Sequence, residues 1–190
     1  LDQARAKGYT GQGVTIAILD GEVYTSAPEL AGADITDKTP CTVTSSASTR
    51  QHGTDVASVL VAHDYGIAPQ AKLLTYRIPL TSAGDTSGSD CRGQLSVSRD
   101  DISSLLNTAM NDGAMIISLS LAGASNSDSL KWAMARALSQ GVIITAGAGN
   151  DAKEQTFEYF GHWSGVVGVS AIGTDGNRQD YSSWGEGVVS

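Results

Sequence analysis

Three polar residues of this sequence, Asp20, His52 and Asn150, have the types and local settings that acid–base chemistry requires. Asp20 directly follows residues 14–19, an apolar run rich in β-branched side chains that predicts a buried strand. A buried Asp can fix the orientation and tautomer of an imidazole such as His52 and stabilise its cation, which leaves the other ring nitrogen as a general base. Asn150, in an Ala-Gly-Asn turn after another apolar run, can offer a side-chain N–H to a developing oxyanion. What this set lacks is a nucleophile.

The simpler alternative for His52 is a helix that happens to begin near a histidine, because most histidines have structural or solvated roles. The sequence predicts the start of that helix directly after His52. Gly53 permits close backbone approach, and Thr54 and Asp55 suit a first turn, where Asp55 would stabilise the helix dipole. We expect the helix to end near His63.

The other periodic segments alternate between strands and helices. Further apolar runs predict strands at residues 72–78, 115–120, 142–146 and 166–170, and one-sided apolar patterns predict helices at residues 98–113 and 127–140. This alternation predicts an α/β fold with a mostly parallel sheet covered by helices on both faces. Ligands of such sheets bind at the carboxyl ends of the strands, where Asp20, residues 120–123 and residues 147–151 all fall.

Composition and charge limit the possible functions. A chain of 190 residues, 41% hydrophobic and 17% charged, predicts one soluble domain, residues 1–190, with a sizeable core. The net charge of -8 argues against a nucleic-acid partner, which requires clustered Lys and Arg. No apolar run approaches the ~20 residues of a membrane-spanning helix. The first residues have no apolar signal-peptide core, so we expect that any targeting segment has been removed.

The cysteines and histidines give two further expectations. Cys41 and Cys91 lie in polar loops, and we expect a disulfide between them, formed in an oxidising compartment and consistent with a secreted or extracytoplasmic location. His52, His63 and His162 have no zinc-type spacing, so no metal or other cofactor is indicated.

Further motifs accompany the three polar residues: His52-Gly53-Thr54, Gly66-Ile67-Ala68-Pro69, Ser118-Leu119-Ser120-Leu121, residues 141–150 and Asp180-Tyr181-Ser182-Ser183-Trp184-Gly185. In order and spacing, over nearly the whole chain, they resemble the subtilisin-like serine proteases. The resemblance implies a three-layer subtilisin-like fold with Asp20 as orienting carboxylate, His52 as general acid/base and Asn150 as oxyanion-hole donor. It also implies that an extended peptide substrate lies between two segments, Leu95, Ser96 and Val97 on one side and Ser120, Leu121, Ala122 and Gly123 on the other.

The resemblance places Glu158 near the floor of the first specificity pocket, where a carboxylate would favour Lys or Arg before the scissile bond. Alternatively, Glu158 points to solvent. The family's Asp-Thr/Ser-Gly is Asp20-Gly21-Glu22 in this chain, which removes a hydroxyl beside Asp20. Glu22 then either adds a carboxylate near the triad or faces water. Many relatives carry a calcium-binding loop at the end of the His helix, but the chain has no room for it before Gly66, so no calcium is expected there.

The family's nucleophile stands in a Gly-Thr-Ser-x-Ala-x-Pro segment, which is absent from these 190 residues. We therefore expect the N-terminal portion of a subtilisin-like catalytic domain, with a fold incomplete at its C-terminal end. Its partner would be the Ser-bearing C-terminal piece of the same precursor, left by internal cleavage, and together they would act as a serine endopeptidase on peptides or proteins. Two alternatives stay open: an inactive subtilase-like binding or scaffold module, and a peptide-processing or macrocyclising enzyme built on the same triad.

Overall fold

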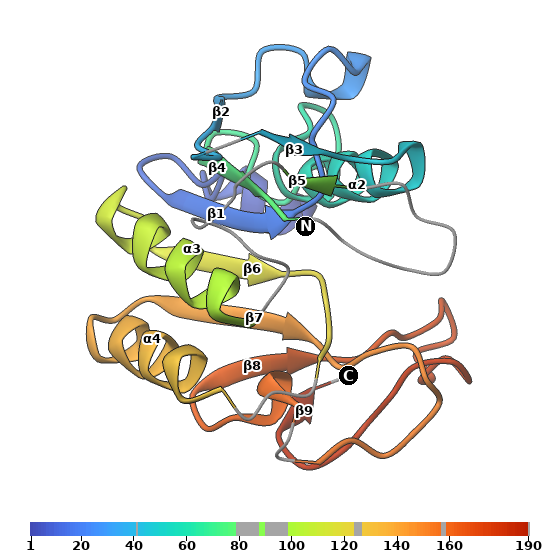
Figure 1. The fold of residues 1–190 in the computed structure, drawn as a ribbon. Coiled ribbons are helices and arrows are strands. Elements are labelled where there is room, and N and C mark those ends of the chain that lie inside the picture. The colour runs from blue at the N-terminus through green and yellow to red at the C-terminus, as the bar shows by residue number, and fades with distance from the viewer. Residues whose placement is uncertain (41, 79–87, 90–98, 124–126, 157–158, 190) are drawn as a thin grey trace.

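A parallel sheet runs through the centre of the computed structural model, which describes residues 1–40, 42–78, 88–89, 99–123, 127–156 and 159–189 (Figure 1). Within these residues the sheet has seven strands in the spatial order β2-β4-β1-β6-β7-β8-β9, and all of its strand pairs are parallel. The strands are β1 (Thr15–Asp20), β2 (Ile35–Asp37), β4 (Lys72–Arg77), β6 (Ile116–Leu119), β7 (Ile143–Gly147), β8 (Val166–Val169) and β9 (Val188–Val189). A separate antiparallel pair joins β3 (Val43–Thr44) and β5 (Gly88–Ser89).

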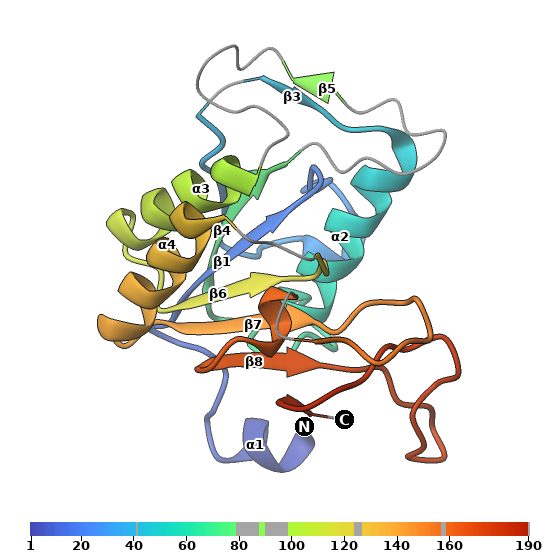
Figure 2. The same cartoon turned by 60° about the horizontal axis from the view of Figure 1, so that its bottom comes forward.

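Helices cover the sheet on both faces, so the predicted α/β architecture is confirmed (Figure 2). Alternation along β1 explains the two layers: Ile16 and Ile18 pack on the side of α2 (Ala47–Val61), and Ala17 and Leu19 pack on the opposite side. That opposite side is covered by α3 (Arg99–Asn111) and α4 (Asp128–Ser139). The short elements are α1 (Asp2–Ala6) and the 3-10 helices η1 (Pro28–Leu30) and η2 (Phe160–His162).

The predicted start of the His52 helix is wrong. α2 begins at Ala47, and Ser46 caps it by accepting the Thr49 N–H at 3.2 Å. His52 therefore lies well inside the helix. Asp55 is too far along it to stabilise the first turn, and its Oδ1 instead accepts a hydrogen bond from Gln51 Nε2 at 2.7 Å. The prediction failed because the first turn of α2 carries polar residues that give no apolar periodicity.

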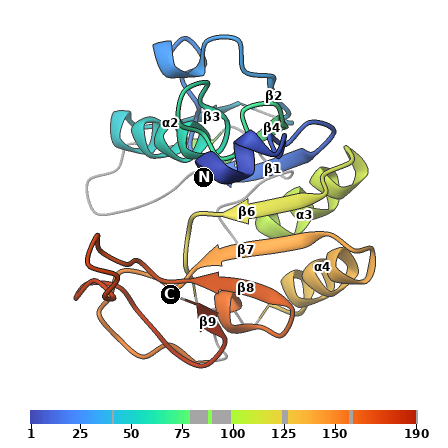
Figure 3. The same ribbon diagram turned by 180° about the vertical axis from the view of Figure 1, so that it is seen from behind.

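The strand order reverses beside β1. From β1 the chain passes through α2 to β4 on one side, and it later adds β6, β7 and β8 on the other side (Figure 3). The carboxyl ends of β1 and β6 thus lie on either side of a topological switch point, the place where open α/β sheets bind ligands. Asp20 is the last residue of β1, and residues 120–123 follow β6.

Candidate active site

Asp20 and His52, 32 residues apart in the sequence, are in direct contact. Nδ1 of His52 lies 2.7 Å from Oδ1 of Asp20. The Asp20 side chain is 1% exposed, whereas that of His52 is 47% exposed. Because an ionised carboxylate can only accept, Nδ1 of His52 carries the proton, and Nε2 is left as the basic nitrogen. The pair has the arrangement that a general base and its orienting carboxylate require.

The surrounding charges raise the pKa of His52 above its ordinary value of 6.5. The hydrogen bond with Asp20 is the largest cause, and the negative charges of Asp20 and Asp55 add to it. Partial burial of the imidazole acts in the opposite direction but is outweighed. The site therefore favours the imidazolium, the form that a general base reaches when it accepts a proton.

Two glycines allow β1 and α2 to approach closely enough for this contact. A Cβ on Gly53 would lie 2.5 Å from the carbonyl oxygen of Gly21, and a Cβ on Gly21 would collide with the carbonyl oxygen of Thr49. The N–H of Gly21 donates to Oδ1 of Asp20 at 2.6 Å. Oδ2 of Asp20 is buried and has no hydrogen-bond partner among the described residues, so the carboxylate is held through Oδ1 alone.

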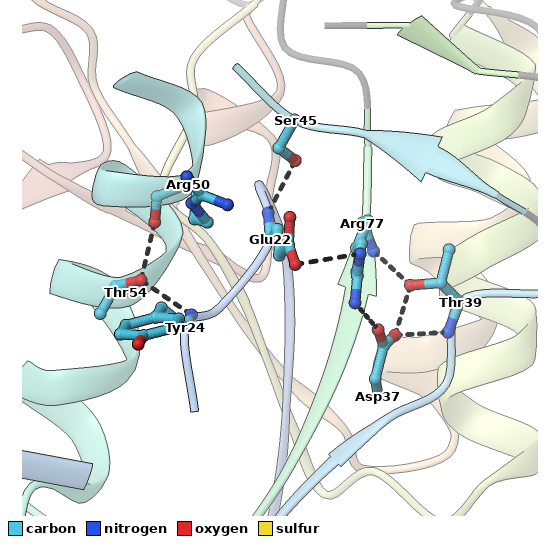
Figure 4. Close-up of polar contacts among 8 residues, drawn as sticks. All are labelled: Glu22, Tyr24, Asp37, Thr39, Ser45, Arg50, Thr54 and Arg77. Carbon is cyan, nitrogen blue, oxygen red and sulfur yellow. Dashed lines mark hydrogen bonds and ion pairs between the residues drawn. The ribbon is translucent and has the colours of Figure 1, made fainter. Parts of the chain in front are cut away.

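Glu22, for which the sequence left two positions open, is paired with Arg77 at the end of β4. Its Oε1 lies 3.4 Å from Nη1 of Arg77, and Nη2 of Arg77 lies 2.5 Å from Oδ2 of Asp37. Figure 4 shows the Glu22 side chain directed toward Arg77 and away from α2. The turn after Asp20 is thereby connected to β4 and β2.

Asn150 is exposed on the turn after β7 and lines a pocket of about 590 Å³ at the carboxyl ends of β6, β7 and β8. Gly149 adopts φ 101°, which a side chain would strain, and its carbonyl accepts the Ser183 N–H at 2.8 Å. Oγ of Ser183 also accepts the Asp151 N–H at 3.2 Å. These bonds fix the turn that carries Asn150.

The predicted substrate segment at residues 120–123 borders the same pocket in part. Ser120, Leu121 and Ala122 line it, whereas Gly123 does not, and the Gly123 carbonyl accepts the Phe160 N–H at 3.3 Å. Residues 120–123 follow β6 outside any helix or strand assigned in the described chain.

Comparison with known proteins decides the family. The model of the subtilase family, Peptidase_S8, matches residues 11–189. The chain belongs to the subtilase family. This subtilase chain is 31% identical to subtilisin BL of Lederbergia lenta over 97% of its length, and 30% identical to a thermostable alkaline protease of Halalkalibacterium halodurans over 96% of its length. It spans 65% of the first relative and 48% of the second.

Solved structures with the same fold include the prenylagaramide maturation protease PagA, with a TM-score of 0.77 at 26% identity, covering 98% of this chain and 63% of that one. The self-cleaved protease domain of PatA gives 0.76 at 27% identity, with 94% and 65% coverage. The PatG macrocyclase in complex with peptide, at 15% identity, a TM-score of 0.73 and coverage of 96% and 64%, shows the fold alone.

The sequence placed Asp151 in the turn after an apolar run but gave it no role in the site. Asp151 is exposed and lines the pocket beside Asn150. The available signal was its position in the same turn, one residue after Asn150. The remaining predicted positions, Leu95, Ser96, Val97, Glu158, Cys41 and Cys91, lie outside the described residues.

In the described part of the chain, no group of three or more His, Cys, Asp or Glu side chains is arranged to hold a metal ion. No helix among the described residues has the length and apolar character needed to cross a membrane.

Proposed function

We propose that this chain supplies Asp20 and His52 of a Ser-His-Asp triad, and Asn150 as an oxyanion donor, to a serine endopeptidase of the subtilisin type. The observation that carries the proposal is the 2.7 Å contact between His52 Nδ1 and the buried carboxylate of Asp20 at the switch point of the sheet. The pocket lined by Asn150 and residues 120–122 lies at the same edge and suits the residue before the scissile bond.

The chemistry follows from these positions. Nε2 of His52 takes the proton of a serine hydroxyl as its oxygen attacks the scissile carbonyl carbon, and Asp20 stabilises the resulting imidazolium. The tetrahedral oxyanion accepts a hydrogen bond from the Asn150 side chain. His52 then passes its proton to the leaving amine, and a water molecule, deprotonated by the same nitrogen, releases the acyl group from the serine.

The serine comes, in this proposal, from the C-terminal piece of the same precursor, left by internal cleavage of one subtilisin-like domain. The nucleophile lies outside these 190 residues, because they contain no Gly-Thr-Ser-x-Ala-x-Pro segment, and the chain spans 65% of subtilisin BL. Internal cleavage also has a parallel among the similar structures, because one of them is a self-cleaved protease domain.

An open apolar surface supports a second polypeptide as well. On the α2 side of the sheet, α2 packs over β1 and β4, but Ile143 on β7 and Val167 and Val169 on β8 are 52%, 39% and 45% exposed. We call these three residues the open sheet face. Contiguous apolar side chains on a sheet are normally covered, and a Ser-bearing piece packed there would lie beside the carboxyl ends of the strands.

A fluorophosphonate probe, which reacts with an activated serine, tests this function. Applied to the purified precursor product, it should label a second polypeptide that co-purifies with this chain, and mass spectrometry should find the Gly-Thr-Ser segment in that polypeptide. His52→Ala should abolish the labelling, whereas His63→Ala, at an exposed histidine outside the site, should retain it. Folded material without any labelled polypeptide would favour the inactive binding or scaffold module instead.

A second candidate function is the maturation of a precursor peptide, because PagA, a maturation protease, and the PatA protease domain are similar at 26% and 27% identity. Hydrolysis and macrocyclisation differ in whether water or an amine releases the acyl group. Mass spectrometry of the products separates them, since a linear product is heavier than the cyclic one by one water molecule. We expect the linear product from this enzyme.

A further inference from the structure

Arg77 is the direct neighbour of Asp20 across the sheet. The two residues are register partners in the β1–β4 pair, and the Ile78 N–H donates to the Asp20 carbonyl at 2.8 Å. The Arg77 side chain is 28% exposed, and its guanidinium contacts the carboxylates of Glu22 and Asp37. Its backbone N–H donates to Oγ1 of Thr39 at 2.9 Å (Figure 4). Arg77 thus connects the turn after Asp20 to the end of β2 and the loop that follows it.

The turn after Asp20 is also held by the buried side chain of Val23 and by the Tyr24 N–H, which donates to Oγ1 of Thr54 on α2 at 3.0 Å. Gly21 contributes no side chain, and Oδ2 of Asp20 has no partner among the described residues. The Glu22 N–H donates to Oγ of Ser45 at 3.0 Å, and the Glu22 side chain reaches Arg77. A displacement of Glu22 would be transmitted to α2, because a Cβ on Gly53, the residue next to His52, would lie only 2.8 Å from the Glu22 carbonyl oxygen.

The Glu22–Arg77 ion pair also affects the charges near His52. In the described chain, the charged neighbours of His52 by contact or along α2 are Asp20, Arg50 and Asp55. Glu22 lies in the turn whose backbone packs against Gly53, and its carboxylate pairs with Arg77 on β4. Asp20 and Asp55 both raise the pKa of His52. The side chain of Glu22 is also negatively charged, and the Arg77 guanidinium that it contacts offsets this charge.

We propose that Arg77 is a positioning residue for the Asp20–His52 pair, which fixes the turn after Asp20 and keeps the Glu22 carboxylate paired away from the imidazole. The Glu22–Arg77 pair thereby adds a side-chain contact to a turn in which the residue after Asp20 is a glycine. The inference rests on the proposed function, because it assigns Arg77 a role in the same site.

The test is Arg77→Leu in the enzyme that contains both pieces. Without the guanidinium, the Glu22 carboxylate loses its partner and is able to turn toward α2, where its charge would add to those of Asp20 and Asp55 at His52. The pKa of His52 should rise by about 0.5, which lowers kcat near neutral pH about threefold and moves the acid limb of the pH–rate profile upward while KM changes little. Adding Glu22→Gln to Arg77→Leu should return the pKa of His52 toward that of the wild type.

Lys38→Gln is the matched control, because it also removes one positive charge from an ion pair, that of Lys38 with Asp112 at 3.7 Å, outside the site. It should leave the profile unchanged. An unaltered His52 titration in Arg77→Leu, or a raised pKa that Glu22→Gln fails to reverse, would overturn the proposal.

Two further readouts keep the test decisive. If Arg77→Leu does not fold, Glu22→Gln alone should lower the pKa of His52, because it removes one negative charge and leaves Arg77 paired with Asp37. An unchanged pKa would again overturn the proposal. The His52 titration is followed by the imidazole NMR signal, which requires no turnover. A wild-type enzyme that the fluorophosphonate probe fails to label would overturn the proposed function, whereas the titration would still decide the role of Arg77.

Discussion

At the scale of single residues, Asp20 sets the protonation of His52, because it supplies both the hydrogen bond and the nearest charge. Asp20→Asn should therefore lower the pKa of His52 and reduce kcat by about 10⁴-fold through loss of the reactive tautomer. The wild-type activity should fall as the pH drops below the raised pKa of His52, and this limb should move to lower pH in Asp20→Asn. A pH–rate profile together with an NMR titration measures both effects.

Asp55→Asn is the control for this variant. Asp55 raises the pKa of His52 through charge alone, so its removal should lower the pKa slightly and preserve kcat at alkaline pH.

The Asp20–His52 pair also affects the stability of the fold. Because the folded chain raises the pKa of His52 above that of the unfolded chain, its stabilisation is complete below about pH 6.5 and is lost as the pH rises through the folded pKa.

Asp151 is the residue most suited to select substrates in the described part of the pocket. Its exposed carboxylate lines the pocket beside Asn150, so it should favour Lys or Arg before the scissile bond. We expect Asp151→Asn to reduce this preference about fivefold, the size typical of a solvent-exposed ion pair. A peptide library that compares kcat/KM after Lys or Arg with that after Leu or Phe measures it.

Glu154→Gln is the matched control for Asp151, because Glu154 is also exposed but lies outside this pocket. Equal cleavage after basic and apolar residues by the wild type would contradict the prediction for Asp151. The role of Glu158 in the pocket floor stays a prediction, and the same library applied to Glu158→Gln tests it.

At the scale of elements, the close approach of α2 to the end of β1 decides the geometry of the site. Helix propensity alone predicts that Gly53→Ala stabilises α2 by about 1 kcal/mol. The structure predicts the opposite, because the added Cβ would lie 2.5 Å from the Gly21 carbonyl oxygen. We expect a loss of about 1–3 kcal/mol in the free energy of unfolding and a lower kcat.

Chemical denaturation and kinetics measure these two quantities. Val59→Ala, on an exposed position of the same helix, should change the free energy of unfolding by no more than about 0.5 kcal/mol. A Gly53→Ala enzyme that is more stable than the wild type and fully active would show that α2 and β1 tolerate a wider spacing.

The disulfide between Cys41 and Cys91 stays a prediction, because both residues lie outside the described chain beyond the β3–β5 pair. Val43 pairs with Ser89 and Thr44 pairs with Gly88. In the sequence, Cys41 stands two residues before Val43 and Cys91 stands two residues after Ser89. If the disulfide forms, both cysteines should resist alkylation until a reductant is added, and mass spectrometry measures the mass that alkylation adds. Full alkylation of unreduced protein would refute the bridge and weaken the proposal of a secreted or extracytoplasmic location.

At the scale of the whole molecule, the open sheet face should hold the Ser-bearing piece. Val167→Arg places a charge in the middle of this face, so we expect the piece to dissociate and fluorophosphonate labelling of the co-purified material to be lost. Trp132→Arg is the control, since Trp132 is 75% exposed on α4, on the opposite side of the sheet. Intact assembly of Val167→Arg would show that the second piece binds elsewhere.

The long, periodic elements were predictable from the sequence. The five apolar runs became β1, β4, β6, β7 and β8 with ends shifted by at most one residue, because burial on both faces of a parallel sheet leaves a continuous apolar signal. The short strands β2, β3, β5 and β9 have two or three residues each, which is too few for any periodicity. Their places depend on pairing with strands distant in the sequence.

The sequence by itself determined that Asp20, residues 120–123 and Asn150 lie at one edge of the sheet, because strand order and parallel direction follow from local patterns. Only the tertiary structure decided that His52 meets Asp20 from inside α2, that Glu22 pairs with Arg77, and that Asp151 lines the pocket. The physical reason is the separation along the sequence over which each feature is determined. Burial leaves a periodic trace in neighbouring residues, whereas an ion pair between residues 22 and 77 depends on how two strands and a turn are placed in space.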